Sequence, residues 1–473
     1  ITSATIRRTQ TGNEAVAPGG ECMRCVRVGS GSASAEDRIE PAVELAQYGD
    51  IQYLCFDTLS EKEIQTATLR KRRNPKEGFD NHIEMRLEPL LPLCAQRGIR
   101  LISNMGSANP RGAVQLIQKL CKRLGLKGLK IACILGDDVR TTVAKLDPIV
   151  AETGQPVSAF GPSLMSANAY IGADVVVTAL QQGADIVIGG RISDASLYLA
   201  PPMYEFGWRA DDKDWDRLAR GIIVGHILEC AGHATGGNFA DPDYKEVPDP
   251  HRLGFPIAEI DTNGDAIITK VPGSGGIVTT ATVTEQLLYE MGDPANYIEP
   301  DVIADITEAR VEQQGKDRVS VRGVRGKKRP ANLKVSLGVL EGFIGEGVLF
   351  FGGPGAVEKA KLAGEIVTKR LDLIGVKPEE LRVDYLGINA LFHPNTAPPA
   401  APLREVGLRV AGRTKARADA AKIAYEVYAL PTNGPSGISA GAIREGVTEV
   451  LGYYHTFIPR ERVKPTVAVV EVK

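Results

Sequence analysis

The sequence has few cysteines, few aromatic residues and no long apolar run. Its seven cysteines among 473 residues are sparse and odd in number, which excludes a disulfide-based scaffold and favours a reducing compartment. No stretch approaches the roughly 18 consecutive apolar residues of a membrane span. The first ~20 residues also lack the apolar core of a signal peptide. We therefore expect a cytoplasmic protein with no membrane partner.

The chain also lacks an excess of charge of either sign. It carries 56 Lys and Arg against 58 Asp and Glu, so the basic footprint of a nucleic-acid-binding protein is missing. The basic run Arg70 to Arg73, with Lys76 nearby, is interpreted as a solvated segment after a helix rather than an anion site. No group of His, Cys, Asp and Glu has metal-ligand spacing, so no metal site is predicted. The predicted partner is a small-molecule substrate, not a nucleic acid.

The first half of the chain repeats one pattern, in which a short apolar run leads into a loop of small residues and then an amphipathic helix. Strands that alternate with helices in this way form parallel sheets. We therefore predict a parallel, Rossmann-like α/β domain over residues 22–250, with its site beyond the carboxyl ends of the strands. The apolar runs are residues 25–28, 51–56, 99–103, 130–135 and 184–188.

The second half has a different rhythm and predicts an α+β domain over residues 251–473. Residues 251–332 are predicted to be rich in strands, with a hairpin that turns at Gln314 to Asp317. Residues 333–459 follow the order β-α-β-β-α-β, which is typical of the ferredoxin-like unit. An open sheet face or edge of this kind commonly pairs with a second copy, so we expect a homo-oligomer.

The loop after the first predicted strand is a candidate ligand site. Gly29 and Gly31 would let the backbone approach a ligand. Glu36 and Asp37 follow at the start of the next helix and could move a proton. An equally good interpretation is a tight turn whose two acids complement the helix dipole.

Two further loops carry polar residues. Asn104, Ser107 and Asn109 offer uncharged donors suited to carboxylate or carbonyl oxygens, although one of them could simply cap a helix. Lys270 stands beside the glycine-rich run at residues 272–276, which could form an anion-binding nest. An ordinary connecting turn explains that run equally well.

The run from Gly189 to Asp194 is the sharpest signal. Arg191 can bind a carboxylate or phosphate with two parallel hydrogen bonds, and Asp194 can hold that arginine or act as a base. A purely structural ion pair is the alternative. Cys230 and His233 could form a nucleophile and its base, but the glycines that follow favour a terminated helix with a buried cysteine.

Several of these motifs together resemble the acyclic terpene utilisation family of the AtuA type, long catalogued as a domain of unknown function. The resemblance spans about Cys25 to Arg462, nearly the whole chain. The motifs that carry it are Val28 to Ile39, Ser103 to Pro110, Gly189 to Asp194, Thr235 to Phe239 and Val271 to Gly276.

The resemblance implies catabolism of geraniol- and citronellol-like terpenoids through branched acyl-CoA thioesters. Coenzyme A would then be part of the substrate, and the resemblance implies no other cofactor, no settled reaction and no agreed catalytic residues. Some relatives carry a C-terminal ferredoxin-fold module with an Arg-Ser-Gly-Asp-Lys-Gly signature. That string is absent here, so such a module would be a separate small partner chain.

We therefore predict an enzyme of lyase or hydratase type that acts on an acyl-CoA or a carboxylate. A non-catalytic binding or scaffold subunit of a catabolic assembly is the alternative, and an NAD-dependent oxidoreductase would rest on the parallel sheet alone. Because parallel strands end at one edge of a sheet, the polar side chains should converge there. The residues concerned are Glu36, Asp37, Asn104, Ser107, Asn109, Arg191 and Asp194.

Overall fold

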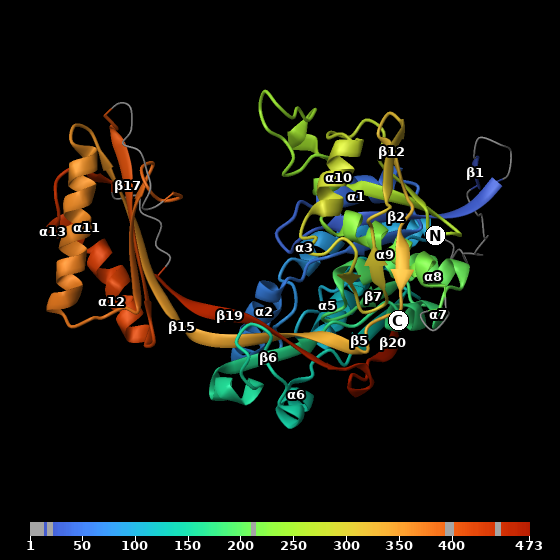
Figure 1. Ribbon diagram of the computed structural model, residues 1–473, viewed down its shortest axis with the longest axis horizontal. Helices are drawn as coiled ribbons and strands as arrows, with labels where there is room; N and C mark the ends of the chain where they lie inside the picture. The colour runs from blue at the N-terminus through green and yellow to red at the C-terminus, as the bar shows by residue number, and fades with distance from the viewer. Residues whose placement is uncertain (1–13, 17–21, 210–213, 393–401, 440–445) are drawn as a thin grey trace. The chain divides into compact units, whose positions relative to one another are not determined.

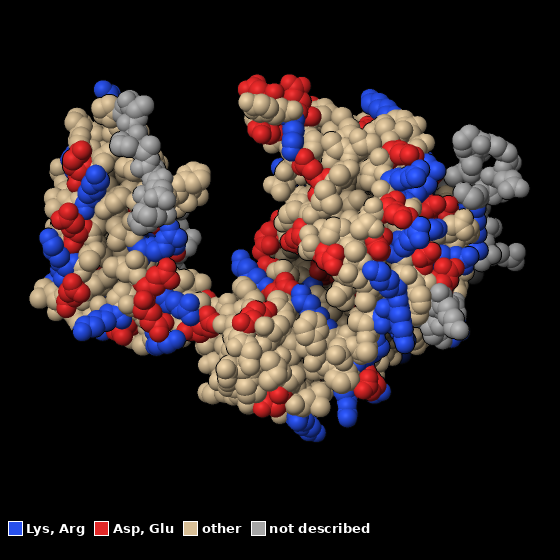
Figure 2. Space-filling view, in the orientation of Figure 1, with Lys and Arg blue, Asp and Glu red and all other residues tan. Residues whose placement is uncertain are grey.

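The computed structural model describes residues 14–16, 22–209, 214–392, 402–439 and 446–473 (Figure 1). The chain divides into two compact units. The first comprises residues 1–161, 165–337 and 453–473, and the second comprises residues 162–164 and 338–452. Acidic and basic side chains are interspersed on the face of each unit drawn in Figure 2, as the near-zero net charge leads one to expect.

A large mixed sheet forms the centre of the first unit. Five neighbouring strands run parallel in the order β2-β3-β4-β7-β5, and they correspond to the five predicted apolar runs. Every residue of β3 is buried, as expected for a strand covered on both faces. The strands are β2 (Cys22–Ser32), β3 (Tyr53–Phe56), β4 (Arg100–Ser103), β5 (Lys130–Leu135) and β7 (Ile186–Ile188).

The helices between these strands begin where local sequence signals place them. Ser60 and Glu63 form a reciprocal capping box at the start of α2, and Asn109 caps α5 with Pro110 as its first residue. Helices α1, α5, α7 and α8 pack against the sheet. The helices of this unit are α1 (Glu40–Tyr48), α2 (Glu61–Arg73), α3 (Ile83–Leu87), α4 (Leu90–Arg97), α5 (Pro110–Arg123), α6 (Arg140–Leu146), α7 (Asp174–Gln181), α8 (Asp194–Phe206), α9 (Trp215–Glu229) and α10 (Thr280–Leu288).

Antiparallel strands extend this sheet on both sides. The β-rich segment supplies β8 (Pro256–Asp261), β9 (Ala266–Lys270), β12 (Arg310–Gly315) and β13 (Arg318–Arg322), which continue from the edge of β2 in the order β8-β9-β13-β12. The predicted hairpin turn between β12 and β13 is present. At the opposite edge, β20 (Thr466–Glu471) pairs with β5.

The sheet is therefore mixed rather than wholly parallel, because these strands cover edges that would otherwise expose unpaired backbone groups. Other short strands of this unit are β1 (Glu14–Val16), which pairs with β2, and β10 (Tyr297–Ile298), β11 (Ile303–Asp305) and β14 (Arg325–Lys327), which form a small sheet of their own. The Rossmann-like and ferredoxin-like assignments and the predicted division at residue 250 stay predictions.

The second unit contains a second mixed arrangement of strands and helices. The sheet to which it contributes has the order β16-β17-β15-β18, with β6 (Leu164–Ala169) and β19 (Gly446–Pro459) also paired to β15. Residues 165–169 of β6, 332–337 of β15 and 453–459 of β19 belong to the first unit. Helices α11 and α12 supply buried residues such as Val367 and Ile423 to its core. The remaining elements are β15 (Asn332–Gly352), α11 (Ala356–Leu373), β16 (Glu380–Leu386), β17 (Glu405–Thr414), α12 (Arg417–Tyr428), α13 (Leu430–Asn433) and β18 (Ile438–Ser439).

Candidate functional site

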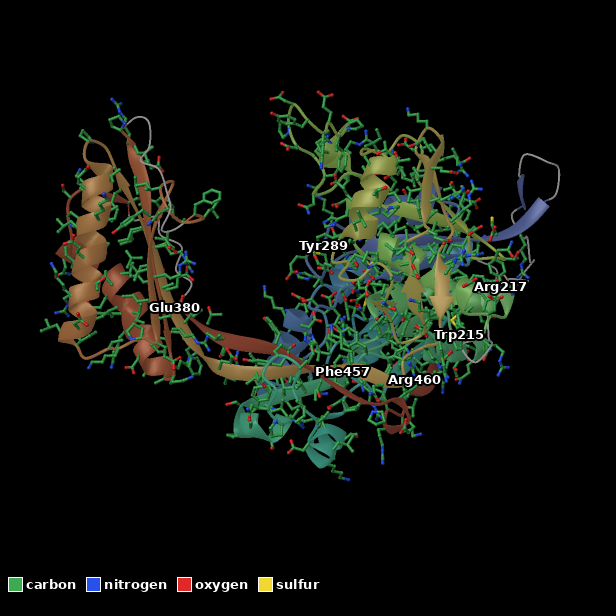
Figure 3. All side chains as sticks on the ribbon, in the orientation of Figure 1. Trp215, Arg217, Tyr289, Glu380, Phe457 and Arg460 are labelled. Carbon is green, nitrogen blue, oxygen red and sulfur yellow. The ribbon has the colours of Figure 1, made fainter. Side chains whose placement is uncertain are left out.

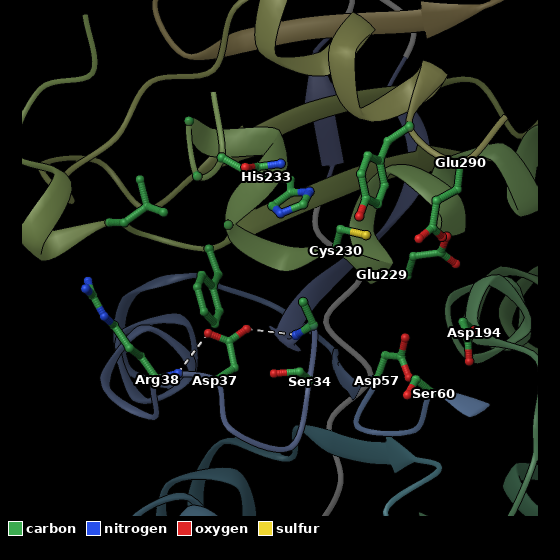
Figure 4. Close-up of a pocket in the computed structure, with 18 of the residues that line it drawn as sticks. Ser34, Asp37, Arg38, Asp57, Ser60, Asp194, Glu229, Cys230, His233 and Glu290 are labelled. Carbon is green, nitrogen blue, oxygen red and sulfur yellow. Dashed lines mark hydrogen bonds between the residues drawn. The ribbon is translucent and has the colours of Figure 1, made fainter. Parts of the chain in front are cut away.

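A cavity of about 700 Å³ lies in the first unit, beyond the carboxyl ends of β2 and β3. Its walls come from the loop after β2, the segment from Asp57 to Glu61, and the first residue of α8. The end of α9, the following turn, the segment before β8 and the segment after α10 also line it (Figure 4). Tyr289, in the last of these segments, is labelled in Figure 3. The cavity lies where ligands bind in sheets with parallel strands.

Carboxyl groups gather at one end of this cavity. Asp57 directly follows β3, Asp194 begins α8 and Glu229 ends α9. Figure 4 shows these side chains on the same side of the cavity, with the carboxyl of Glu290 beside that of Glu229. Residues far apart in the sequence thus meet because a strand end and two helix termini point at one space.

A hydrogen-bonded network joins two of these carboxyls. Nδ2 of Asn104 lies 2.8 Å from Oδ1 of Asp57 and 3.4 Å from Oδ1 of Asp194. Nη2 of Arg191 donates to Oδ2 of Asp194 over 2.8 Å. The Asn104 amide therefore bridges the carboxyls, and a guanidinium contacts only one of them.

Arg191 supports the cavity from behind rather than lining it. Its side chain is 1% exposed, it donates to the carbonyl of Leu59, and its guanidinium carbon lies 4.2 Å from the ring centroid of Tyr170. These contacts hold the guanidinium in place. Its positive charge consequently acts on Asp194 and not directly on the empty part of the cavity.

Asp57 and Asp194 have different surroundings, and these affect the pKa values of the two carboxyls differently. Burial, followed by the charge of Asp194, raises the pKa of Asp57 well above its usual value. Burial also raises the pKa of Asp194, but the adjacent Arg191 guanidinium opposes this rise. When two interacting carboxyls share a site, one of them ionises and the other holds a proton. Asp194, which has the arginine, is the one that ionises first.

Glu229 is paired with a buried histidine. Oε1 of Glu229 lies 2.8 Å from Nδ1 of His226, and Nε2 of that ring lies 3.2 Å from the carbonyl of Leu287. A carbonyl only accepts, so this contact assigns the ring proton to Nε2 and leaves Nδ1 as an acceptor. Burial raises the pKa of Glu229 well above its usual value and lowers that of His226. Both directions favour a protonated Glu229 that donates to a neutral imidazole.

Cys230 and His233 both line the cavity, but their contacts differ from those of a nucleophile and its base. Helix α9 ends at Glu229, as the following glycines predict. Nδ1 of His233 lies 3.2 Å from Oε1 of Gln286. Burial strongly raises the pKa of the Cys230 thiol, which opposes formation of the reactive thiolate.

The predicted residues of the first loop have mainly structural contacts. Asp37 lines the cavity, but its carboxylate accepts from the backbone N–H groups of Ala33 and Arg38 at 2.8 Å each, and Glu36 is exposed. Gly29 and Gly31 are buried in β2. A Cβ atom at Gly31 would lie 2.3 Å from the Phe56 ring, so packing explains that glycine.

The other predicted residues lie outside this cavity. Ser107 and Asn109 line a second one, and Nδ2 of Asn109 lies 2.8 Å from the carbonyl of Glu77. Nζ of Lys270 lies 2.7 Å from the carbonyl of Ser274, so the glycine-rich run there accepts a cation instead of presenting N–H groups to an anion. The seven polar residues expected to converge are thus divided. Asp37 and Asp194 line the first cavity and Ser107 and Asn109 line the second, whereas Asn104 and Arg191 line neither and Glu36 is exposed.

Sequence reasoning did not select Asp57 or Glu229 for the site. The signal for Asp57 was its position directly after a predicted strand. Glu229 ends the apolar stretch from Ile222 to Leu228, which is buried throughout, and an acid at such a place needs a partner or a proton. Its partner His226 lies three residues earlier, on the same face of the helix.

Among the described residues, no group of three or more His, Cys, Asp and Glu side chains has the geometry to hold a metal ion. None of the described helices combines the length and apolar character required to cross a membrane.

Comparison with known proteins gives one clear result. The family model described as acyclic terpene utilisation family protein AtuA matches residues 26–469. No curated protein and no solved structure matches the chain. Because the family model covers nearly the whole sequence, the chain belongs to the acyclic terpene utilisation family.

Proposed function

We propose that this protein is an enzyme that adds or removes water by acid–base catalysis on a branched carboxylic acid or its coenzyme A thioester. The observation that carries the proposal is the gathering of Asp57, Asp194 and Glu229 at one end of a cavity. Their surroundings favour an ionised group beside protonated ones, and such a set is what proton transfer in both directions requires. Membership of a family implicated in acyclic terpene utilisation supports a catabolic substrate with a branched chain.

In the dehydration direction, the Asp194 carboxylate takes a proton from carbon. The Glu229 proton, which is donated to His226 in the free protein, passes to the departing hydroxyl. The C–H and C–O bonds break, a C=C bond forms, and water leaves. Glu229 ends ionised and Asp194 ends protonated, so solvent exchange restores both. In the hydration direction the roles reverse: ionised Glu229 accepts a proton from the attacking water, and protonated Asp194 gives its proton to the other carbon. Arg191 and Asn104 position Asp194 for this role.

The opposite end of the cavity suits the acidic part of such a substrate. Arg38 lines this end, and its guanidinium lies 3.3 Å from the carbonyl of His251. A carbonyl is neutral, so this contact does not balance the positive charge of Arg38. Leu59, Leu253 and Phe255 add apolar wall to the cavity. A carboxylate or thioester near Arg38 would direct an alkyl chain along this wall toward the carboxyl groups.

The test is a screen of wild-type protein against branched hydroxy acids, enoic acids and their coenzyme A thioesters, read by mass spectrometry. We expect gain or loss of one water molecule from at least one compound. Asp194→Asn and Glu229→Gln should each lower that rate by about 10²–10⁴-fold, while the exposed Glu40→Gln leaves it unchanged. Glu36→Gln tests a separate point. The sequence predicts a catalytic role for Glu36, which would lower the rate in this variant, whereas the exposed position of Glu36 predicts an unchanged rate.

A non-catalytic scaffold predicts a different pattern. No compound in the screen would then change mass, and substitution at Asp194 would alter only the melting temperature of the protein. Binding of a compound without turnover would favour the scaffold and contradict the enzyme proposal.

A further inference from the structure

A second cavity lies in the first unit at the carboxyl ends of β4 and β5. Its volume is about 400 Å³. The C-terminal part of α2, the start of α5 and the segment from Leu135 to Arg140 enclose it together with residues of β6. Like the first cavity, it occupies the edge of the sheet where ligands bind. The reaction proposed for the first cavity does not use any of its residues.

Four cationic side chains line this second cavity, namely those of Lys71, Arg72, Arg111 and Arg140. Within the described residues, none of them forms an ion pair with a carboxylate. The Arg72 guanidinium donates to the carbonyl of Met165 over 2.8 Å, and the Lys71 ammonium donates to the carbonyl of Ala108. These contacts fix two of the cations in place without neutralising their charge.

The cavity has two acidic residues against these four cations. Oδ2 of Asp137 accepts from the Asn168 amide at 2.9 Å and from the Arg191 backbone N–H at 3.0 Å. Burial raises the pKa of Asp137, which disfavours its negative charge. Asp138 is exposed and accepts from the backbone N–H of Arg140.

Like charges are also brought together here. The charge of Arg140, after burial, lowers the pKa of Arg72, so the two guanidinium groups repel one another. Bringing cations together costs free energy unless an anion lies between them. The arrangement is therefore less favourable in the empty protein than with a negatively charged ligand in place.

We propose that this second cavity binds a ligand through a phosphate or diphosphate group. A phosphate group carries more than one negative charge and several acceptor oxygens, which matches arginines that donate in pairs and a lysine that acts as a point charge. The start of α5, a helix of 14 residues, adds a favourable dipole at the same place. The proposal does not depend on the acid–base reaction assigned to the first cavity.

Calorimetric titration of the full chain with sodium pyrophosphate, ADP and adenosine tests this proposal. Pyrophosphate and ADP should bind and adenosine should not, with affinity that falls as salt is added. Arg72→Gln and Arg140→Gln should each weaken pyrophosphate binding by about tenfold, the loss expected for one charged hydrogen-bonding contact. Arg97→Gln is the matched control, because Arg97 is exposed at the end of α4, away from this cavity.

Arg140 is exposed, so its substitution should leave the melting temperature unchanged and keep the test valid if Arg72→Gln destabilises the fold. Asp194→Asn should retain pyrophosphate binding, which separates this site from the proposed reaction. ADP and pyrophosphate of equal affinity would indicate recognition of the diphosphate alone, and tighter ADP binding would indicate a nucleotide. Absence of binding by the wild type, or equal binding by Arg140→Gln, would overturn the proposal.

Discussion

The proposed reaction in the first cavity depends on the protonation states of two carboxyl groups. The Asp194 carboxyl must be ionised and the Glu229 carboxyl protonated, and the pKa of each is raised from its usual value. We predict that kcat rises with pH as Asp194 ionises, at a pH above that of an ordinary aspartate. It should fall again at higher pH when Glu229 loses its proton. A pH–rate profile with any substrate from the screen measures both limbs.

The variants assign those limbs to residues. Glu229→Gln should remove the fall at high pH along with most of the rate, since a glutamine amide cannot donate an acidic proton. An unchanged alkaline limb in Glu229→Gln would show that another group supplies the proton.

Substitution of Arg191 distinguishes a role in substrate binding from a structural role behind Asp194. The sequence predicts that Arg191 holds an anionic substrate, so that Arg191→Ala would weaken binding by about 2–4 kcal/mol. Its burial behind Asp194 instead predicts loss of stability, because removal of one partner leaves a buried charge uncompensated, at about 3–5 kcal/mol. Thermal unfolding and ligand titration of the same variant separate the two. A large loss of affinity at an unchanged melting temperature would restore the binding role.

Part of this site could be predicted at the residue scale. Asp194 and Asn104 follow strands, and a parallel sheet brings such residues to one edge. The apolar stretch and His226 mark Glu229 as a buried acid that needs a proton, but they do not place it at the cavity. That placement depends on how α9 packs against α10, where Leu287 binds His226 across about 60 positions of sequence.

At the scale of elements, α2 connects the two cavities, since the chain from Leu59 to Glu61 lines the first and Thr68, Lys71 and Arg72 line the second. Its capping box joins Ser60 and Glu63. Ser60→Ala should lower the free energy of unfolding by about 1 kcal/mol, through loss of the cap. Urea unfolding measures this change, and Ser60→Asp, which can still cap, should retain most of the stability. Equal stability of both variants would mean that the cap contributes nothing.

The elements themselves were more predictable than their pairing. Short apolar runs before small-residue loops identified the five parallel strands, and the hairpin of β12 and β13 followed from its turn residues. The pairing of β8 with β2 and of β20 with β5 could not be predicted. Edge pairing joins segments hundreds of residues apart, and any suitable strand satisfies the same backbone groups.

For the whole molecule, buried acids make stability depend on pH. Burial raises the pKa of Glu299 to about 8 and that of Asp301 to about 6. The folded protein therefore holds these protons more tightly than the unfolded chain, whose acids ionise near pH 4. Their contribution is complete below about pH 4 and is lost as pH rises toward 8.

Glu299→Gln should flatten this dependence. Relative to wild type, the variant should gain about 3–4 kcal/mol between pH 5 and pH 8, which melting temperatures across that range would measure. Asp301 is unchanged in this variant, so a smaller slope remains. Parallel curves for the two proteins would contradict the assignment to Glu299. The homo-oligomer expected from the sequence stays a prediction at this scale.

The central claim is that the first cavity holds a protonated carboxyl beside an ionised one at neutral pH. Infrared difference spectroscopy of wild type against Glu229→Gln at pH 7 tests it most directly, because a protonated carboxyl and a carboxylate absorb at different frequencies. Other buried acids such as Glu299 also hold protons at pH 7, so we expect the difference spectrum to contain one protonated-carboxyl band, that of Glu229, which is absent from the difference between wild type and the exposed control Glu40→Gln. A difference spectrum that contains only carboxylate bands would show Glu229 ionised at pH 7 and would contradict the account.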